Sequence, residues 1–149
     1  MIYWDTSCVL KLYTAESDSA QWQDCATGTS EELVASRLLE AELAFALLRK
    51  EMQGDIRPGA TARLLGKFQR DVQAGRFRLV PVGADVITRA GIVAETCYRA
   101  EPPVPLRTLD GLHLATAVLL GCTGIASADE RMRRAAPLLG IPLISPPPD

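Results

Sequence analysis

The residues best suited to chemistry in this sequence are four carboxylic acids that lie far apart along the chain. Carboxylates that crowd together repel and raise one another's proton affinity, so a shared site needs a compensating cation. A hard divalent ion such as Mg²⁺ or Mn²⁺ takes oxygen ligands, can orient a phosphodiester, and can supply hydroxide for in-line attack. Phosphodiester hydrolysis by a metal-activated water therefore suits these acids if the fold brings them together. The four acids are Asp5, Glu42, Asp110 and Asp129.

The segment 107–117 carries the third of these acids. It follows a proline-rich stretch, and its apolar residues lie almost all around a helical wheel, which indicates a buried helix. Asp110 lies in the first turn, His113 lies one turn further along the same side, and Thr108 is the expected N-cap. Taken alone, Asp110 fits a simple role at the helix start equally well, because the helix dipole favours an acid there.

Other candidate residues also leave alternatives open. Glu42 lies on the apolar side of a long helix, yet a partly exposed helix acid is more common. Ser7 and Ser127 are candidates to hydrogen-bond a carboxylate, a metal-bound water or a phosphate, although lone serines more often form turns and caps. His113 suggests a general base, but a core histidine bonded to the backbone or to an acid is more common inside a buried helix.

Short apolar strands alternate with helices, which predicts a three-layer α/β fold with a mostly parallel central sheet covered on both faces. We expect about five strands and about six helices from this alternation. Ser36 is the expected cap of the longest helix, Ser17 or Ser19 caps an earlier one, and Pro81 places the third strand near an edge or ends it. The tail 146–149 continues neither kind of structure. The expected strands cover 2–4, 33–35, 77–82, 124–127 and 142–144, and the expected helices 8–13, 17–26, 37–53, 58–74, 85–99, 107–120 and 130–139.

This layout would bring the acids to one edge of the sheet. Ligands of such sheets bind outside the carboxyl ends of the strands. Asp5 follows the first strand and Asp129 follows the fourth. Asp110 opens the helix that leads to the fourth strand, and Glu42 lies in the helix after the second. We therefore expect the four acids to share a pocket that can hold a small cation.

The composition describes one globular domain over residues 1–149, with 48% hydrophobic and 23% charged residues. Its net charge of −2 gives no global footprint for nucleic acid, so RNA binding would need a local patch. No signal peptide or membrane-spanning stretch is visible. Four widely spaced cysteines and a single histidine argue against a zinc site or a disulfide framework, and the expected location is the cytoplasm.

Four short motifs contain the acids and serines: Asp5-Thr6-Ser7, Ser36 with Glu42, 108–117, and Ser127-Ala128-Asp129. Together they resemble the PIN-domain family, and in particular the VapC-type toxins of bacterial toxin–antitoxin modules. The resemblance covers nearly the whole chain. The Asp-Thr-Ser motif alone is weak, whereas the Asp-x-Leu-His-Leu-Ala core is strong. Ser127 stands where family members commonly have Thr, and Gly111 where they often have Ala, but neither departure removes a carboxylate.

The resemblance implies a PIN-like, Rossmann-like fold and a Mg²⁺- or Mn²⁺-dependent endoribonuclease that acts as the toxin of such a module. By similarity, the four acids hold the metal and carry catalysis, with Ser7 and Ser127 as supporting hydroxyls. Lys11, Arg107 and Arg131 are candidates to grip the RNA backbone, although a solvated basic surface fits each as well.

The resemblance also implies protein partners, namely a homodimer and a VapB-type antitoxin that docks on the paired helices 37–53 and 58–74. An apolar stripe on these helices is expected to exceed what one domain can bury. The stripe consists of Leu38, Phe45, Leu48, Leu64, Leu65 and Phe68.

Two other functions are weaker. A non-catalytic PIN-like module that binds RNA or protein would be marked by a missing acid, and all four are present. A haloacid-dehalogenase-type phosphatase would need a second acid two residues after Asp5, where this chain has Ser7. No glycine-rich turn follows a strand, as a P-loop or dinucleotide enzyme would require.

Overall fold

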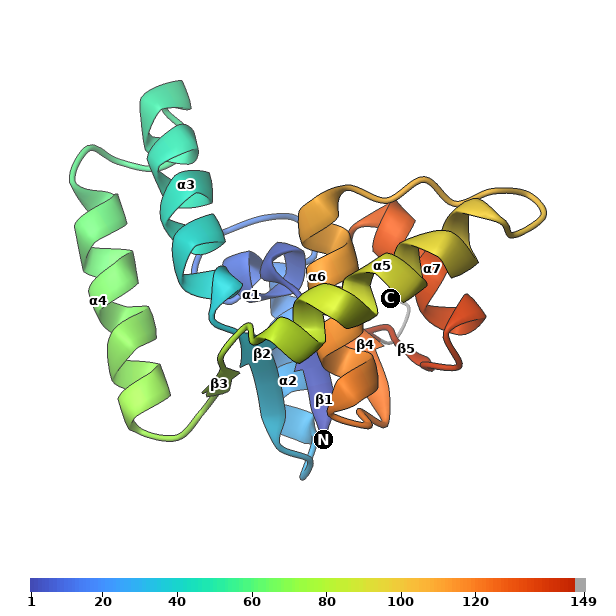
Figure 1. Cartoon of the computed structure of the whole chain (residues 1–149). Helices are drawn as coiled ribbons and strands as arrows, with labels where there is room; N and C mark the ends of the chain where they lie inside the picture. The colour runs from blue at the N-terminus through green and yellow to red at the C-terminus, as the bar shows by residue number, and fades with distance from the viewer. Residues whose placement is uncertain (147–149) are drawn as a thin grey trace.

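Five parallel strands form one sheet, in the order β3-β2-β1-β4-β5, in the computed structural model of the chain, which describes residues 1–146 (Figure 1). Tyr3 pairs with Val34 on one side and with Ile125 on the other, so β1 is the central strand. The predicted parallel α/β sheet is confirmed. The strands are β1 (Ile2–Trp4), β2 (Leu33–Ser36), β3 (Arg78–Val80), β4 (Gly124–Ala126) and β5 (Leu143–Ile144).

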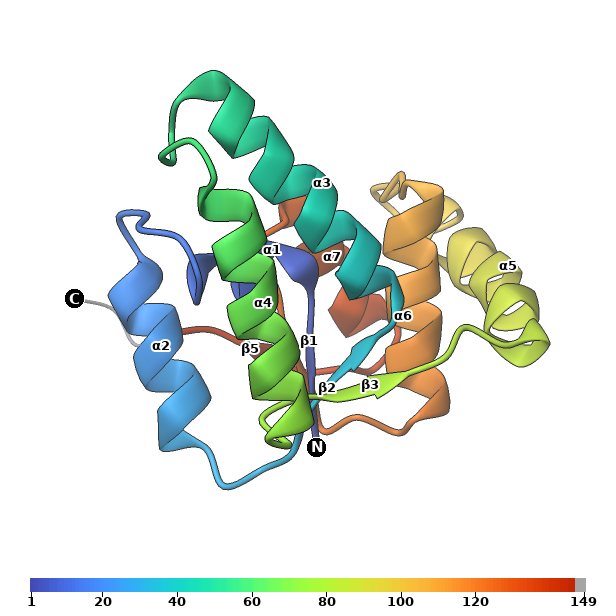
Figure 2. The same ribbon diagram turned by 90° about the vertical axis from the view of Figure 1, so that its left-hand side faces the viewer.

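Seven helices within residues 1–146 cover the two faces of the sheet (Figures 1 and 2). Helices α1 to α4 pack on the face that carries Trp4 and Ala35, and α5 to α7 pack on the face that carries Tyr3 and Val34. Successive residues of a strand point to opposite faces, so β1 contributes to both hydrophobic cores. The helices are α1 (Thr6–Lys11), α2 (Ser19–Gly28), α3 (Leu38–Gln53), α4 (Ala60–Gln73), α5 (Ala84–Tyr98), α6 (Thr108–Leu119) and α7 (Glu130–Leu138).

The chain changes direction across the sheet between β1 and β4. It runs outward from β1 to β2 and β3 over one face, and returns over the other face to β4 and β5. Ligands of open α/β sheets bind at such a switch point, outside the carboxyl ends of the two strands. Trp4 pairs with Ala126 there, so the next residues, Asp5 and Ser127, leave neighbouring strands at the same edge.

Helix α6 is buried as its apolar pattern predicts, but it begins differently. Its N-cap is Arg107, with ψ at 158°, and Thr108 is already the first helical residue. The expected Thr108 cap is wrong. Asp110, in the first turn, accepts the backbone N–H of Arg107 at 3.0 Å, as the third helical residue does in a capping box, so Arg107 is the N-cap residue.

Two other helix starts also differ from the prediction. Helix α1 begins at Thr6, two residues early, because Asp5 caps it by accepting the Ser7 N–H. Helix α2 has Asp18 as its N-cap residue, whereas Ser17 or Ser19 was expected.

The N-cap residue of α3 is Arg37, whereas Ser36 was expected, but the Ser36 hydroxyl does accept the Leu38 N–H at 3.2 Å. Strand β3 is short and lies at an edge, followed by Pro81, which cannot donate to a neighbouring strand. No helix within residues 1–146 is long and apolar enough to cross a bilayer. The prediction for the tail beyond Pro146 lies outside the described residues.

Candidate active site

Asp5 directly follows β1 and is only 6% exposed. Three donors reach one carboxylate oxygen, Oδ2: the Ser7 N–H at 3.3 Å, the Ser7 hydroxyl at 2.6 Å and the Ser127 hydroxyl at 3.0 Å. The Ser7 and Ser127 hydroxyls accept the backbone N–H groups of Ala128 and Asp129, so their own protons are free to face Asp5. No hydrogen bond from within residues 1–146 reaches the other oxygen, Oδ1.

Asp110 and Asp129 are joined by the guanidinium of Arg107. The Oδ2 of Asp110 accepts the Arg107 backbone N–H and Nε, both at 3.0 Å, and its Oδ1 accepts Nη2 at 2.9 Å. The same Nη2 donates to Asp129 Oδ2 at 3.0 Å. Asp129 caps α7 through Oδ1, which accepts the N–H groups of Arg131 at 2.8 Å and Met132 at 3.4 Å.

Glu42 lies on α3, the helix that follows β2. Both of its described side-chain hydrogen bonds go to Oε2, one from the Thr6 hydroxyl and one from His113 Nε2 at 2.6 Å. Within residues 1–146 no hydrogen bond reaches Oε1. Burial alone would raise the pKa of Glu42, but the hydrogen bond from His113 and the positive charge of that ring outweigh it, so the pKa lies below its ordinary value of 4.5.

The four acids share one pattern of contacts, and we call them the acid cluster: Asp5, Glu42, Asp110 and Asp129. In each carboxylate, backbone groups or buried side chains hold one oxygen. The second oxygen has no described partner in Asp5 and Glu42, and in Asp110 and Asp129 it contacts only arginine guanidinium groups. The acids are thus oriented by fixed donors while four oxygens stay available to a cation.

His113 is the core histidine bonded to an acid that the sequence suggests. Its ring is buried, donates to Glu42 through Nε2, and contacts the Tyr3 hydroxyl through Nδ1 at 2.7 Å. Burial favours the neutral ring, but the hydrogen bond to Glu42 and the negative charges of Asp5, Glu42 and Asp110 raise the pKa of His113 above its ordinary value of 6.5.

Sequence reasoning missed two residues that touch the site, Tyr3 and Thr6. The signal for Tyr3 is the alternation of β1, which turns Tyr3 towards α6 while Ile2 and Trp4 face α1 to α4. Thr6 is adjacent to Asp5, but its contact with Glu42 joins α1 to α3 and has no sequence signature.

The three basic residues proposed for RNA lie in different surroundings. Arg107 and Arg131 have side chains that are 60% and 44% exposed, and Arg131 lies 3.6 Å from both Asp110 Oδ2 and Asp129 Oδ2. Lys11 is only 15% exposed, and its ammonium is paired with acids outside the acid cluster. Arg107 and Arg131 are therefore the cations in contact with the acid cluster.

A divalent cation is the group that these four carboxylate oxygens would hold, two of them without a described partner and two in contact with arginines. Within residues 1–146 no three acid, histidine or cysteine side chains are arranged as a ready metal site. Instead, Arg107 Nη2 lies between Asp110 Oδ1 and Asp129 Oδ2, two of the available oxygens. A positive group already binds there and the donors are hard oxygens, so the residues present fit a hard divalent cation.

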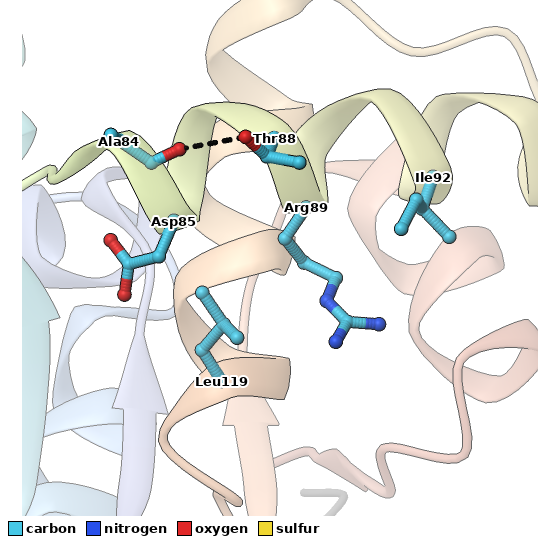
Figure 3. A pocket seen from close by; sticks show the side chains of 6 residues that line it. All are labelled: Ala84, Asp85, Thr88, Arg89, Ile92 and Leu119. Carbon is cyan, nitrogen blue, oxygen red and sulfur yellow. Dashed lines mark hydrogen bonds between the residues drawn. The ribbon is translucent and has the colours of Figure 1, made fainter.

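The hollow shown in Figure 3 is a different place. It has a volume of about 380 Å³ and lies between α5 and the C-terminal part of α6. It contains one acid, one arginine and none of the acid cluster, so it offers no comparable chemistry. Its lining residues are Ala84, Asp85, Thr88, Arg89, Ile92 and Leu119.

The family follows from a comparison with known protein families, in which the model of the PIN domain matches residues 2–138. The chain belongs to the PIN-domain family. Ribonuclease VapC46 of Mycobacterium tuberculosis is 34% identical to this PIN domain over 147 residues, and the alignment covers 97% of each chain.

Solved structures share the fold of this PIN domain. Mycobacterium tuberculosis VapC20, described as a toxin that cleaves the sarcin–ricin loop, aligns with a TM-score of 0.68 over 91% of this chain and 95% of its own, at 16% identity. A toxin–antitoxin complex from Klebsiella pneumoniae aligns with a TM-score of 0.67 over 98% of each chain, at 14% identity. At such identities the likeness concerns the fold.

Proposed function

We propose that this PIN domain is a divalent-metal-dependent endoribonuclease and the toxin of a VapBC-type toxin–antitoxin module. The observation that carries the proposal is the contact pattern of the acid cluster, in which fixed donors hold one oxygen of each acid and leave the other available. The 34% identity of the chain to ribonuclease VapC46 supports the same activity.

The acid cluster is the proposed metal-binding and catalytic set. Bound Mg²⁺ or Mn²⁺ would lower the pKa of a coordinated water and offset the charge on the phosphodiester. The chain's own contribution is orientation: Ser7 and Ser127 fix Asp5 through Oδ2, and the start of α7 fixes Asp129 through Oδ1. These bonds leave Asp5 Oδ1 and Asp129 Oδ2 as the ligand oxygens.

Arg107 and Arg131 are the proposed contacts to RNA. Both lie at the acid cluster with exposed side chains, so they can exchange a carboxylate for an RNA phosphate without unfolding any element. Arginine binds phosphate through two parallel hydrogen bonds, which orients the backbone as well as attracting it.

The proposed protein partners are a VapB-type antitoxin and a second copy of the chain. Helix α3 exposes Phe45, Leu48 and Met52 by 73%, 57% and 81%, and this spacing places them on one side of the helix. The wider stripe expected from the sequence is only partly right, since Leu64 and Phe68 are buried in the core. The proposed location of the protein is the cytoplasm.

RNA cleavage tests the proposed activity. Wild type should cut RNA in the presence of Mg²⁺ or Mn²⁺, and Asp110→Asn should be slower by about a thousandfold, since a lost metal ligand removes several kcal/mol of transition-state stabilisation. Asp85→Asn is a matched control, because Asp85 is also an acid in the first turn of a helix, α5, outside the acid cluster. Equal rates for wild type and Asp110→Asn would contradict the proposal.

A further inference from the structure

A chain of hydrogen bonds runs from the backbone of β2 through the core to Glu42. The Ser36 backbone N–H donates to the Tyr3 hydroxyl at 3.0 Å, which lies 2.7 Å from His113 Nδ1, and His113 Nε2 lies 2.6 Å from Glu42 Oε2. Tyr3 is fully buried and His113 is 1% exposed. Their rings pack edge to face with centroids 5.8 Å apart, so each ring helps to orient the other.

The hydrogen atoms in this chain can be assigned by counting donors. Burial raises the pKa of Tyr3, so the phenol keeps its proton. Its oxygen already accepts the Ser36 N–H, so its proton goes to Nδ1 of a neutral His113 ring. The remaining ring proton must then lie on Nε2, facing Glu42. A charged ring also carries a proton on Nε2, so the donor to Glu42 is present in both states of His113.

The position of His113 also relates two members of the acid cluster. His113 follows Asp110 by three residues on α6, so the two side chains lie on the same side of the helix. One rigid helix therefore supplies Asp110 and the donor that holds Glu42, which belongs to α3. The distance between the two acids depends on this hydrogen bond as well as on the packing of the helices.

We propose that His113, held by Tyr3, is a positioning residue for the metal site: its Nε2–H binds Oε2 of Glu42 and leaves Oε1 as the ligand oxygen. The inference rests on the proposed function, because it assigns a role to residues behind a proposed metal ligand. His113 itself contacts neither metal nor RNA in this assignment. Groups that orient metal ligands typically change metal affinity or activity by about 10- to 100-fold when they are replaced.

The first test compares two amides at position 113 by Mn²⁺ titration, with the dissociation constant measured calorimetrically. His113→Gln places an amide near the position of Nε2 and keeps a donor to Glu42, whereas His113→Asn reaches only as far as Nδ1. His113→Asn should bind Mn²⁺ about 10- to 100-fold more weakly than wild type. His113→Gln should recover most of that affinity.

The second test keeps the aromatic ring that packs against His113. Tyr3→Phe removes the hydroxyl that donates to Nδ1 and keeps the aromatic ring, so His113 loses the hydrogen bond that holds its ring opposite Glu42. Mn²⁺ affinity should fall by about tenfold. Tyr13→Phe is the matched control, because it removes another tyrosine hydroxyl, which donates to the Asp71 carboxylate outside the acid cluster. This control should bind Mn²⁺ as wild type does.

The outcomes separate this inference from the proposed function. If wild type neither binds Mn²⁺ nor cuts RNA, the proposed function fails and the inference fails with it. If wild type binds Mn²⁺ and Asp110→Asn does not, while His113→Asn and Tyr3→Phe bind as wild type does, only the positioning role is overturned. If His113→Asn and Tyr3→Phe melt at a lower temperature but bind Mn²⁺ as wild type does, His113 and Tyr3 stabilise the core and do not position the metal site.

Discussion

Two clusters of charged side chains each include a residue of α3, and their charges are compensated in different ways. In the first, which we call the lysine cluster, Lys11 contacts Asp18 at 2.5 Å and Glu16 at 3.2 Å, and Lys50 contacts Glu16 at 3.0 Å. Two lysines face two acids there. In the acid cluster, two of the four carboxylates, those of Asp110 and Asp129, contact Arg107 and Arg131, whose side chains are 60% and 44% exposed.

The difference shows in what each cluster does for folding. In the lysine cluster burial would raise the pKa of Glu16, but hydrogen bonds from Lys50 and Lys11 hold it below its ordinary value of 4.5. Its charges therefore stabilise the fold. In the acid cluster, burial and the nearby charge of Asp110 oppose the contacts with His113 that lower the pKa of Glu42. Repulsion among the carboxylates therefore lowers the stability of the fold unless a cation binds. A locally unfavourable arrangement of this kind is expected at a functional site.

Breaking the lysine cluster should give the largest loss of stability. Lys11→Met removes the cation shared by Glu16 and Asp18, and should destabilise the protein by about 2 kcal/mol, between the values for exposed and buried pairs. Chemical denaturation measures the change. Lys67→Met is the control, because Lys67 is exposed and lies 5.2 Å from the Tyr13 ring. Equal losses of stability in both variants would show that the ion pairs of Lys11 stabilise the fold no more than an exposed lysine does.

Lowering the pH should remove the contribution of the lysine cluster to stability. Because the pKa of Glu16 is lower in the folded protein, its charge stabilises the fold above pH 4.5, and this contribution is lost as the pH falls through the folded pKa. Wild type should exceed Glu16→Gln by about 1 kcal/mol at neutral pH. Melting temperatures measured between pH 7 and pH 3 should converge. A gap that persists at pH 3 would contradict the assignment.

The arginine contacts of the acid cluster should have the smallest effect. Arg107→Ala removes the guanidinium between Asp110 and Asp129, where we expect a cation to bind. Mn²⁺ affinity should rise by about threefold, because an exposed ion pair contributes less than about 1 kcal/mol. RNA affinity at low salt should fall, since a phosphate contact is lost. Weaker Mn²⁺ binding in Arg107→Ala would contradict the view that Arg107 and the cation compete for the same carboxylate oxygens.

Much of the fold and the choice of acids could be predicted from the sequence, because both depend on local patterns. The apolar pattern identified α6 as buried, and the strand ends placed Asp5 and Asp129 at one edge, because parallel strands end together. The N-cap of α6 was wrong because the choice between Thr108 and Arg107 depends on where the Asp110 carboxylate reaches.

What could not be predicted depends on contacts between elements. Tyr3 reaches His113 across 110 residues, and Lys11 finds its partners through a loop whose path no pattern indicates. Phe45, Leu64 and Phe68 were expected in one stripe that the domain leaves uncovered, yet only Phe45 of these three is exposed, at 73%, whereas Leu64 and Phe68 are buried. Leu39, Leu43 and Leu47 fill the side of α3 that faces the sheet. Whether an apolar side chain is buried depends on what packs against it.

Thermal melting with and without Mg²⁺ tests most directly whether the acid cluster is a cation site. Without metal, Asp5→Asn relieves repulsion and should melt at or above wild type, whereas Asp18→Asn in the lysine cluster should melt lower. Saturating Mg²⁺ should stabilise wild type and Asp18→Asn by about 2.7 kcal/mol at a hundred times the dissociation constant, and Asp5→Asn far less. If Mg²⁺ does not change the melting temperature of wild type, or raises that of Asp5→Asn equally, the acid cluster is not a cation site.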